Sequence, residues 1–126
     1  VLLDAASFVS TSKLDLKKYT PDFVALSFYK IFGFPTGMGA LIVKNGNYFL
    51  VWNCLWSDSL DSVGTLKKKY FGGGTVAATL SNENYKVFRE NISAKFEDGT
   101  VDFLNIIALR TGLETISLLG IDKISR

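Results

Sequence analysis

The chain has 126 residues, 48% of them hydrophobic, and a formal net charge of +2 with both signs interspersed, which leaves no basic stripe for nucleic acid. One cysteine and no histidine exclude an internal disulfide and leave almost no ligands for a zinc or haem site. The longest apolar run, Tyr48 to Trp56, is interrupted by Asn53 and is far shorter than the ~20 residues of a membrane-spanning helix.

Three apolar segments predict strands of an α/β fold. Residues 1–6 form a continuous apolar run with Asp4 near its end, which is typical of a strand buried on both faces of a mainly parallel sheet. Residues 23–28 and 39–43 predict two further strands, and the glycines and proline of 33–39 predict a tight loop between them. We therefore expect the functional site to lie beyond the ends of these strands.

Lys30 is the chemically unusual residue, because its neighbours in sequence are Phe28, Tyr29, Ile31 and Phe32. Apolar surroundings disfavour the charged form of an amine, and a neutral amine is the nucleophile that forms a Schiff base with an aldehyde. The alternative is a lysine with a buried stem and its ammonium in water, and spacing alone favours that alternative.

The aromatic segment 45–62 has neither a helical nor an alternating period. It predicts a hairpin or an extra core layer if the fold covers it, and an aggregation or partner patch if it is exposed. Within it, Cys54 is expected to be a buried, inert thiol. The lysines at 67–69 are expected to form a solvated face.

The C-terminal third predicts one long helix. Apolar residues recur at helical spacing from Phe103 to Leu119, Gly120 marks the end, and Asp102 or Thr100 can cap the start. Arg110 on this helix is expected to be a surface charge. The glycines at 72–74 lack the Lys-Ser/Thr ending of a phosphate-binding P-loop, so nucleotide binding is not expected.

Residues 27–39 read Ser-Phe-Tyr-Lys-Ile-Phe-Gly-Phe-Pro-Thr-Gly-Met-Gly, and residues 96–100 read Phe-Glu-Asp-Gly-Thr. Both stretches resemble the class V aminotransferase and cysteine desulfurase families, and the first is most similar to the molybdenum cofactor sulfurases of eukaryotes. The resemblance implies an α/β large domain of pyridoxal 5′-phosphate (PLP) fold type I, mainly parallel, with flanking helices. Residues 1–126 would be part of that domain, and 46–62 would be an insert foreign to the family.

The resemblance also implies roles for individual residues. Lys30 would be the PLP lysine, Asp4 would hold the proton on the pyridine nitrogen, and Ser27 would bind the phosphate. Without the resemblance, Asp4 is better explained as a strand-end carboxylate that caps a turn.

Three further cofactor contacts are implied less directly. Ser7 stands where many desulfurases have a glutamine that contacts the phenolic oxygen, and it reaches less far. Tyr29 stands where bacterial desulfurases commonly have a histidine, and it cannot shuttle protons at neutral pH. Thr100 would reach across a homodimer to the phosphate of the partner subunit.

The implied reaction takes sulfur from L-cysteine through an enzyme persulfide to the molybdenum cofactor and releases alanine. The alternatives are a cysteine desulfurase or selenocysteine lyase with another acceptor, and a catalytically inactive fragment. The family's upstream phosphate loop, stacking aromatic residue, persulfide cysteine and substrate-binding arginine are not found in these residues, so we expect the chain alone to be inactive. We expect a cytoplasmic protein that has no metal and binds neither nucleic acid nor membrane.

Overall fold

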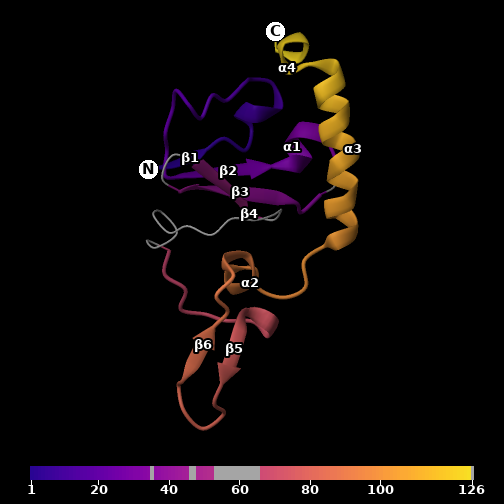
Figure 1. The fold of residues 1–126 in the computed structure, drawn as a ribbon. Coiled ribbons are helices and arrows are strands. Elements are labelled where there is room, and N and C mark those ends of the chain that lie inside the picture. Colours follow the sequence, from indigo (N-terminus) through magenta and orange to yellow (C-terminus); the bar gives the residue numbers. More distant parts are fainter. Residues whose placement is uncertain (35, 46–47, 53–65, 126) are drawn as a thin grey trace.

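The computed structural model describes residues 1–34, 36–45, 48–52 and 66–125. Its larger sheet contains β1 (Leu2–Asp4), β2 (Phe23–Ser27), β3 (Gly39–Asn45) and β4 (Tyr48–Trp52), which lie side by side in that order (Figure 1). β1 and β2 are parallel, whereas β2 with β3 and β3 with β4 are antiparallel.

The expectation of a mainly parallel sheet is therefore wrong for the strands that the structure describes. Parallel neighbours need a crossover of about a dozen or more residues, usually with a full helix. The link between β2 and β3 holds only α1 (Phe28–Phe32) and a glycine-rich turn, and two residues separate β3 from β4. The chain therefore reverses direction at both connections. The start of the aromatic segment forms β4, which pairs as a hairpin with β3, a strand that lies mostly before the segment; Cys54 lies outside the described residues.

Val43 of β3 is fully buried on one face of this sheet. On the opposite face, Ala5, Val24 and Ile42 form a buried cluster. Side chains from β1, β2 and the connection before β2 cover them, namely Leu3, Val9, Leu14, Leu16 and Leu26. The connection includes the 3-10 helix η1 (Phe8–Ser10) and lies over the sheet in Figure 1.

β1 itself is not buried on both faces, contrary to expectation. Its residue Leu2 is 66% exposed, because β1 is the edge strand of the described sheet and only β2 pairs with it. A continuous apolar run shows that a strand can be buried, but its burial depends on neighbours elsewhere in the chain.

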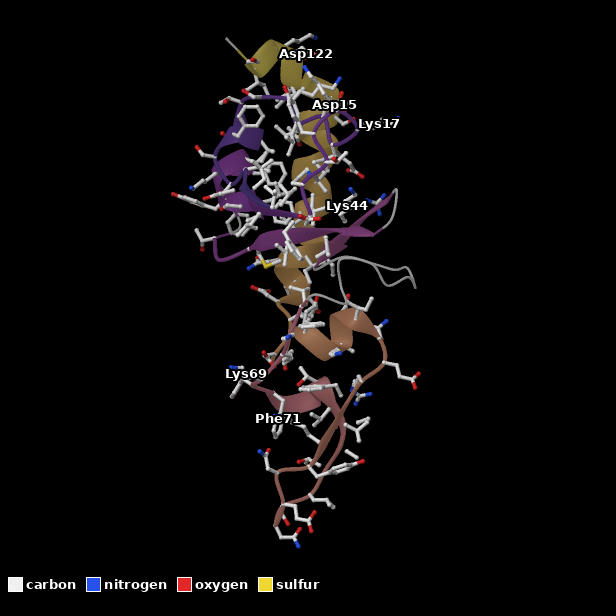
Figure 2. All side chains as sticks on the ribbon, turned by 90° about the vertical axis from the view of Figure 1, so that its left-hand side faces the viewer. Asp15, Lys17, Lys44, Lys69, Phe71 and Asp122 are labelled. Atoms are coloured by element: carbon white, nitrogen blue, oxygen red, sulfur yellow. The ribbon has the colours of Figure 1, made fainter. Side chains whose placement is uncertain are left out.

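A smaller lobe, here called the hairpin lobe, comprises residues 66–96. It contains η3 (Gly73–Thr75), the antiparallel strands β5 (Val76–Thr79) and β6 (Lys86–Phe88), and α2 (Ile92–Phe96). Lys69 and Phe71 lie in this lobe, well away from Asp15 and Lys17 above the larger sheet (Figure 2). Both strands are too short and exposed to show an alternating pattern, so the sequence did not predict them.

The expected long helix is confirmed as α3 (Phe103–Leu119), and the short α4 (Ile121–Ile124) follows Gly120. Asp102 rather than Thr100 caps α3, since the Asp102 carboxylate accepts a hydrogen bond from the Asn105 N–H at 3.2 Å. Arg110 pairs with Glu114 and is 82% exposed, which confirms a surface charge. Among the described helices, none combines the length and apolar character needed to cross a bilayer.

α3 packs against α1 at Gly112. A Cβ atom built on Gly112 would lie 2.9 Å from the ring of Phe32, so glycine is what allows this close approach. The helix that carries Lys30 is thus held by the sheet on one side and by α3 on the other (Figure 1).

Candidate active site

The ends of β1 and β2 bring two of the candidate residues to one edge of the sheet. Because these strands are parallel, their carboxyl ends meet at the same edge. Asp4 is opposite Ala25, and Ser27 lies two residues farther along β2. Ser7 then leads into η1, and η1 contacts α1, which carries Tyr29 and Lys30. The fold therefore brings five of the six candidate residues to this edge of the sheet. We call it the Lys30 edge, and its members are Asp4, Ser7, Ser27, Tyr29 and Lys30.

Lys30 lies on the outer face of α1 and is exposed. The rings of Phe28 and Phe32 stack one helical turn apart, with centroids 6.2 Å from each other. Residues four apart share a helix face, whereas a residue between them points elsewhere. The expectation that Lys30 has apolar surroundings is therefore wrong for the residues described. Its amine is left accessible to a ligand.

The backbone around Lys30 is closed into a fixed loop. Gly33 ends α1 with a φ of 76°, and its N–H donates to the Tyr29 carbonyl at 2.7 Å. At the base of the loop, the Phe28 N–H donates to the Met38 carbonyl at 3.1 Å. The glycine-rich motif is therefore what turns the chain from β2 through α1 into β3.

Asp4 caps a turn, as the sequence suggested for this residue when the family resemblance is set aside. Its Oδ1 accepts a hydrogen bond from the Ala6 N–H at 3.0 Å. The carboxylate also lines a largely apolar hollow of about 680 Å³ between β1 and the connection that ends at Pro21. Lys30 does not line this hollow, and within the described residues no hydrogen bond or ion pair joins Lys30 to Asp4.

The remaining candidates at the Lys30 edge are polar groups open to ligands. Ser27 is half-buried immediately before α1, and its hydroxyl does not cap that helix. Ser7 is exposed, with its carbonyl accepting from the Ser10 hydroxyl at 2.6 Å, and Tyr29 is 50% exposed. An accessible amine, a carboxylate and a hydroxyl fit the aldehyde, pyridine nitrogen and phosphate of PLP. By contrast, the described residues contain no cluster of side chains suited to a metal ion.

Thr100 is the candidate that the structure does not bring to the Lys30 edge. It is exposed, two residues before the Asp102 cap of α3. Asp98, two residues before Thr100, and Val101, directly after it, line a shallow hollow of about 510 Å³ shared with the end of β2 and the start of β3.

An ion pair between a buried lysine and an exposed aspartate, close to Thr100, was not predicted from the sequence. The Lys68 side chain is only 6% exposed, and its Nζ donates to Asp98 Oδ1 at 2.6 Å and to the Lys95 carbonyl at 2.8 Å. The expectation that the lysines at 67–69 form a solvated face is therefore wrong for Lys68, although Lys67 and Lys69 are exposed. Thirty residues separate Lys68 from Asp98, so no local pattern reveals the pair.

Asp98 is held in its charged form by these neighbours. The hydrogen bond from Lys68 is the main cause that lowers the pKa of Asp98, and the Gly72 N–H, which donates at 2.9 Å, lowers it further against the opposing effect of desolvation. The buried Thr75 hydroxyl lies near enough to favour the charge slightly, although it has no hydrogen-bond partner of normal geometry.

Comparison with known proteins identifies similar sequences. Residues 1–53 match the aminotransferase class-V family. The chain is 51% identical over 119 residues to the molybdenum cofactor sulfurase of Danio rerio and 55% identical over 116 residues to that of Bombyx mori, which is 94% and 92% of this chain. The similarity of this chain to molybdenum cofactor sulfurases is therefore confirmed, and the chain spans 12% of the length of each of these two relatives.

A solved structure confirms the fold class. The chain superposes on the apo structure of a cysteine desulfurase from Thermococcus onnurineus NA1 with a TM-score of 0.68 and 24% sequence identity. The match covers 96% of this chain and 26% of the desulfurase. The α/β architecture is therefore that of part of a fold type I large domain.

Proposed function

We propose that the protein carrying this chain is a PLP-dependent enzyme that transfers sulfur from L-cysteine to the molybdenum cofactor. The observation that carries the proposal is the Lys30 edge, where an accessible amine, the Asp4 carboxylate and the Ser27 hydroxyl gather at the ends of two parallel strands. The sulfurases of Danio rerio and Bombyx mori, about half identical to this chain, support this acceptor over others. We place the reaction in the cytoplasm.

Each residue at the Lys30 edge has a chemical task in this proposal. When bound, PLP supplies an aldehyde that reacts with amines and a ring that withdraws electrons from the substrate. Lys30 would bind the aldehyde of PLP through its exposed amine. Asp4 keeps a proton on the pyridine nitrogen, because a carboxylate stabilises the positive charge there.

The phosphate and the ring oxygen require separate contacts. Ser27 donates its hydroxyl hydrogen bond to the phosphate, where an anionic acceptor makes the bond stronger than a neutral pair. Ser7 and Tyr29 offer hydroxyls near the ring. Thr100 serves the phosphate bound in a partner subunit, so the active unit is a homodimer with shared sites.

Borohydride trapping tests the role of Lys30. The purified protein is incubated with PLP, reduced and digested, and mass spectrometry then locates the added mass. We expect the label on the peptide with Lys30, its loss in Lys30→Ala, and no change in Lys17→Ala, which alters another exposed lysine. A label spread over several surface lysines, or none at all, would overturn the cofactor site. Alanine released from L-cysteine, with sulfur recovered on the molybdenum cofactor, tests the reaction and the acceptor.

A further inference from the structure

The Lys68 side chain is only 6% exposed, and its ammonium pairs with the partly exposed carboxylate of Asp98. It donates to Asp98 Oδ1 and to the Lys95 carbonyl, and it lies 6.0 Å from the centre of the Phe96 ring. A buried charge is tolerated only when it is paired and hydrogen-bonded. Lys68 therefore fixes the end of α2 and the Asp98 carboxylate at one point.

Because Lys68 holds Asp98 in place, Asp98 in turn restrains two segments, the glycine loop at Gly72 and the span that leads to Asp102. Its carboxylate accepts the Gly72 N–H at 2.9 Å, which ties down the glycine loop before η3. In the other direction only three residues, 99–101, separate it from Asp102, the residue that caps α3. Gly99 turns the chain in this span with a φ of 77°, a conformation that side chains other than glycine rarely adopt.

Thr100 lies in the middle of this span, between two anchored carboxylates. It is exposed, and in the described part of the chain no hydrogen bond engages its hydroxyl. A loop held at both ends loses less conformational entropy on binding than a free one, so a ligand that Thr100 contacts binds more tightly.

We propose that Lys68 and Asp98 are positioning residues that hold the Thr100 hydroxyl ready for the phosphate of a bound cofactor. This inference rests on the proposed function, because it requires PLP as the ligand. Lys68 and Asp98 act through Thr100 and need not touch the cofactor themselves. Their contribution is therefore confined to ligands that carry a phosphate.

The comparison of PLP with pyridoxal, which lacks the phosphate, tests this directly. Lys68→Met is expected to raise the Kd for PLP about tenfold, the effect of losing one well-placed charged hydrogen bond, and to leave the Kd for pyridoxal unchanged. Lys67→Met is the matched control, since it removes an exposed lysine one residue away and should change neither Kd. An equal loss of affinity for both ligands would overturn the inference and indicate a general structural role.

A double-mutant cycle identifies Thr100 as the intermediary. Thr100→Val removes the hydroxyl while keeping the shape, and Lys68→Met added to it should weaken PLP binding no further. Additive effects would contradict the inference. If the wild-type protein fails to bind PLP, the proposed function fails; if it binds PLP and the cycle is additive, only the positioning role fails.

Hydrogen exchange of the cofactor-free protein gives a readout independent of PLP. In Lys68→Met the Gly72 amide, which donates to Asp98 Oδ1, should exchange about tenfold faster, because the carboxylate that accepts its hydrogen loses its anchor. Unchanged exchange would contradict the inference. Should Lys68→Met not fold, as judged by circular dichroism, Asp98→Asn decides, since it keeps the shape and an oxygen acceptor but removes the charge. Asp98→Asn is expected to weaken PLP binding about threefold, and this effect should disappear when Thr100 is already replaced by valine.

Discussion

Asp98 carries its charge beside an ammonium that is almost completely removed from water. The hydrogen bond from Lys68 lowers the pKa of Asp98 below its ordinary value of 3.8. A carboxylate whose pKa is lower in the folded state stabilises that state at every pH above the unfolded value. This stabilisation is lost as the pH falls from about 3.8 through the lower folded value, because both states then bind the proton.

The difference in unfolding free energy between the wild-type protein and Asp98→Asn should follow this titration. We expect a constant difference above about pH 5 and a decrease as the pH falls below about 4, measured by urea denaturation. Glu114→Gln is the control, because it breaks an exposed helix pair with Arg110 that contributes little at any pH. If the difference in unfolding free energy between the wild-type protein and Asp98→Asn stays constant down to about pH 2.5, the lowered pKa of Asp98 does not contribute to stability.

At the scale of elements, the position of Lys30 depends on how closely β3 approaches β2. Gly39 pairs with Ser27 at the start of β3. A Cβ atom built on Gly39 would lie 2.7 Å from the carbonyl oxygen of Leu26, closer than real contacts allow. The obstacle is backbone within a hydrogen-bonded strand, so it cannot turn aside as a flexible side chain could.

Gly39→Ala should therefore destabilise the protein by about 1–3 kcal/mol, the usual cost of forcing an extra carbon into a packed site. Urea denaturation measures this loss. Gly74→Ala, where the new Cβ meets nothing within 4 Å and the backbone is not left-handed, should change stability by less than about 0.5 kcal/mol. If the two variants are equally stable, the close approach of β3 to Ser27 is not what requires glycine.

At the scale of the whole molecule, a large apolar surface is left uncovered. Leu104, Ile107 and Leu118 of α3 are 68%, 68% and 86% exposed, and Leu2 of β1 is exposed as well. Few side chains in the described residues are fully buried, so the core is small for a chain of this length. A helix that is apolar on several faces is normally enclosed by further protein.

The 126 residues expressed alone should therefore self-associate. Size-exclusion chromatography is expected to give an apparent mass well above 13.9 kDa, with strong binding of a hydrophobic dye and no turnover of L-cysteine. Replacing Leu104 and Ile107 by lysine should lower the apparent mass, whereas Thr111→Lys at another exposed position of α3 should not. A sharp monomer peak without dye binding would contradict this expectation.

Local features of this protein could be predicted from the sequence alone. The helix from Phe103 to Leu119, the turn at Gly33 and the motif around Lys30 each depend on residues within about four positions of one another, although the sequence left Asp102 and Thr100 as alternative caps. The family resemblance could also be recognised from the sequence, because it rests on two short motifs, each of contiguous residues. The roles of Lys30, Asp4, Ser27, Ser7, Tyr29 and Thr100 remain predictions.

Tertiary structure alone decided the direction of the strands, the exposure of Lys30 and the burial of Lys68. Lys30 has four apolar neighbours in sequence and is exposed, because helical geometry turns Phe28 and Phe32 away from it. Lys68 lies among lysines and is buried, because Asp98, thirty residues later, folds back against it. Burial and charge pairing depend on contacts between distant parts of the chain, and a local pattern carries no information about which distant residues will meet.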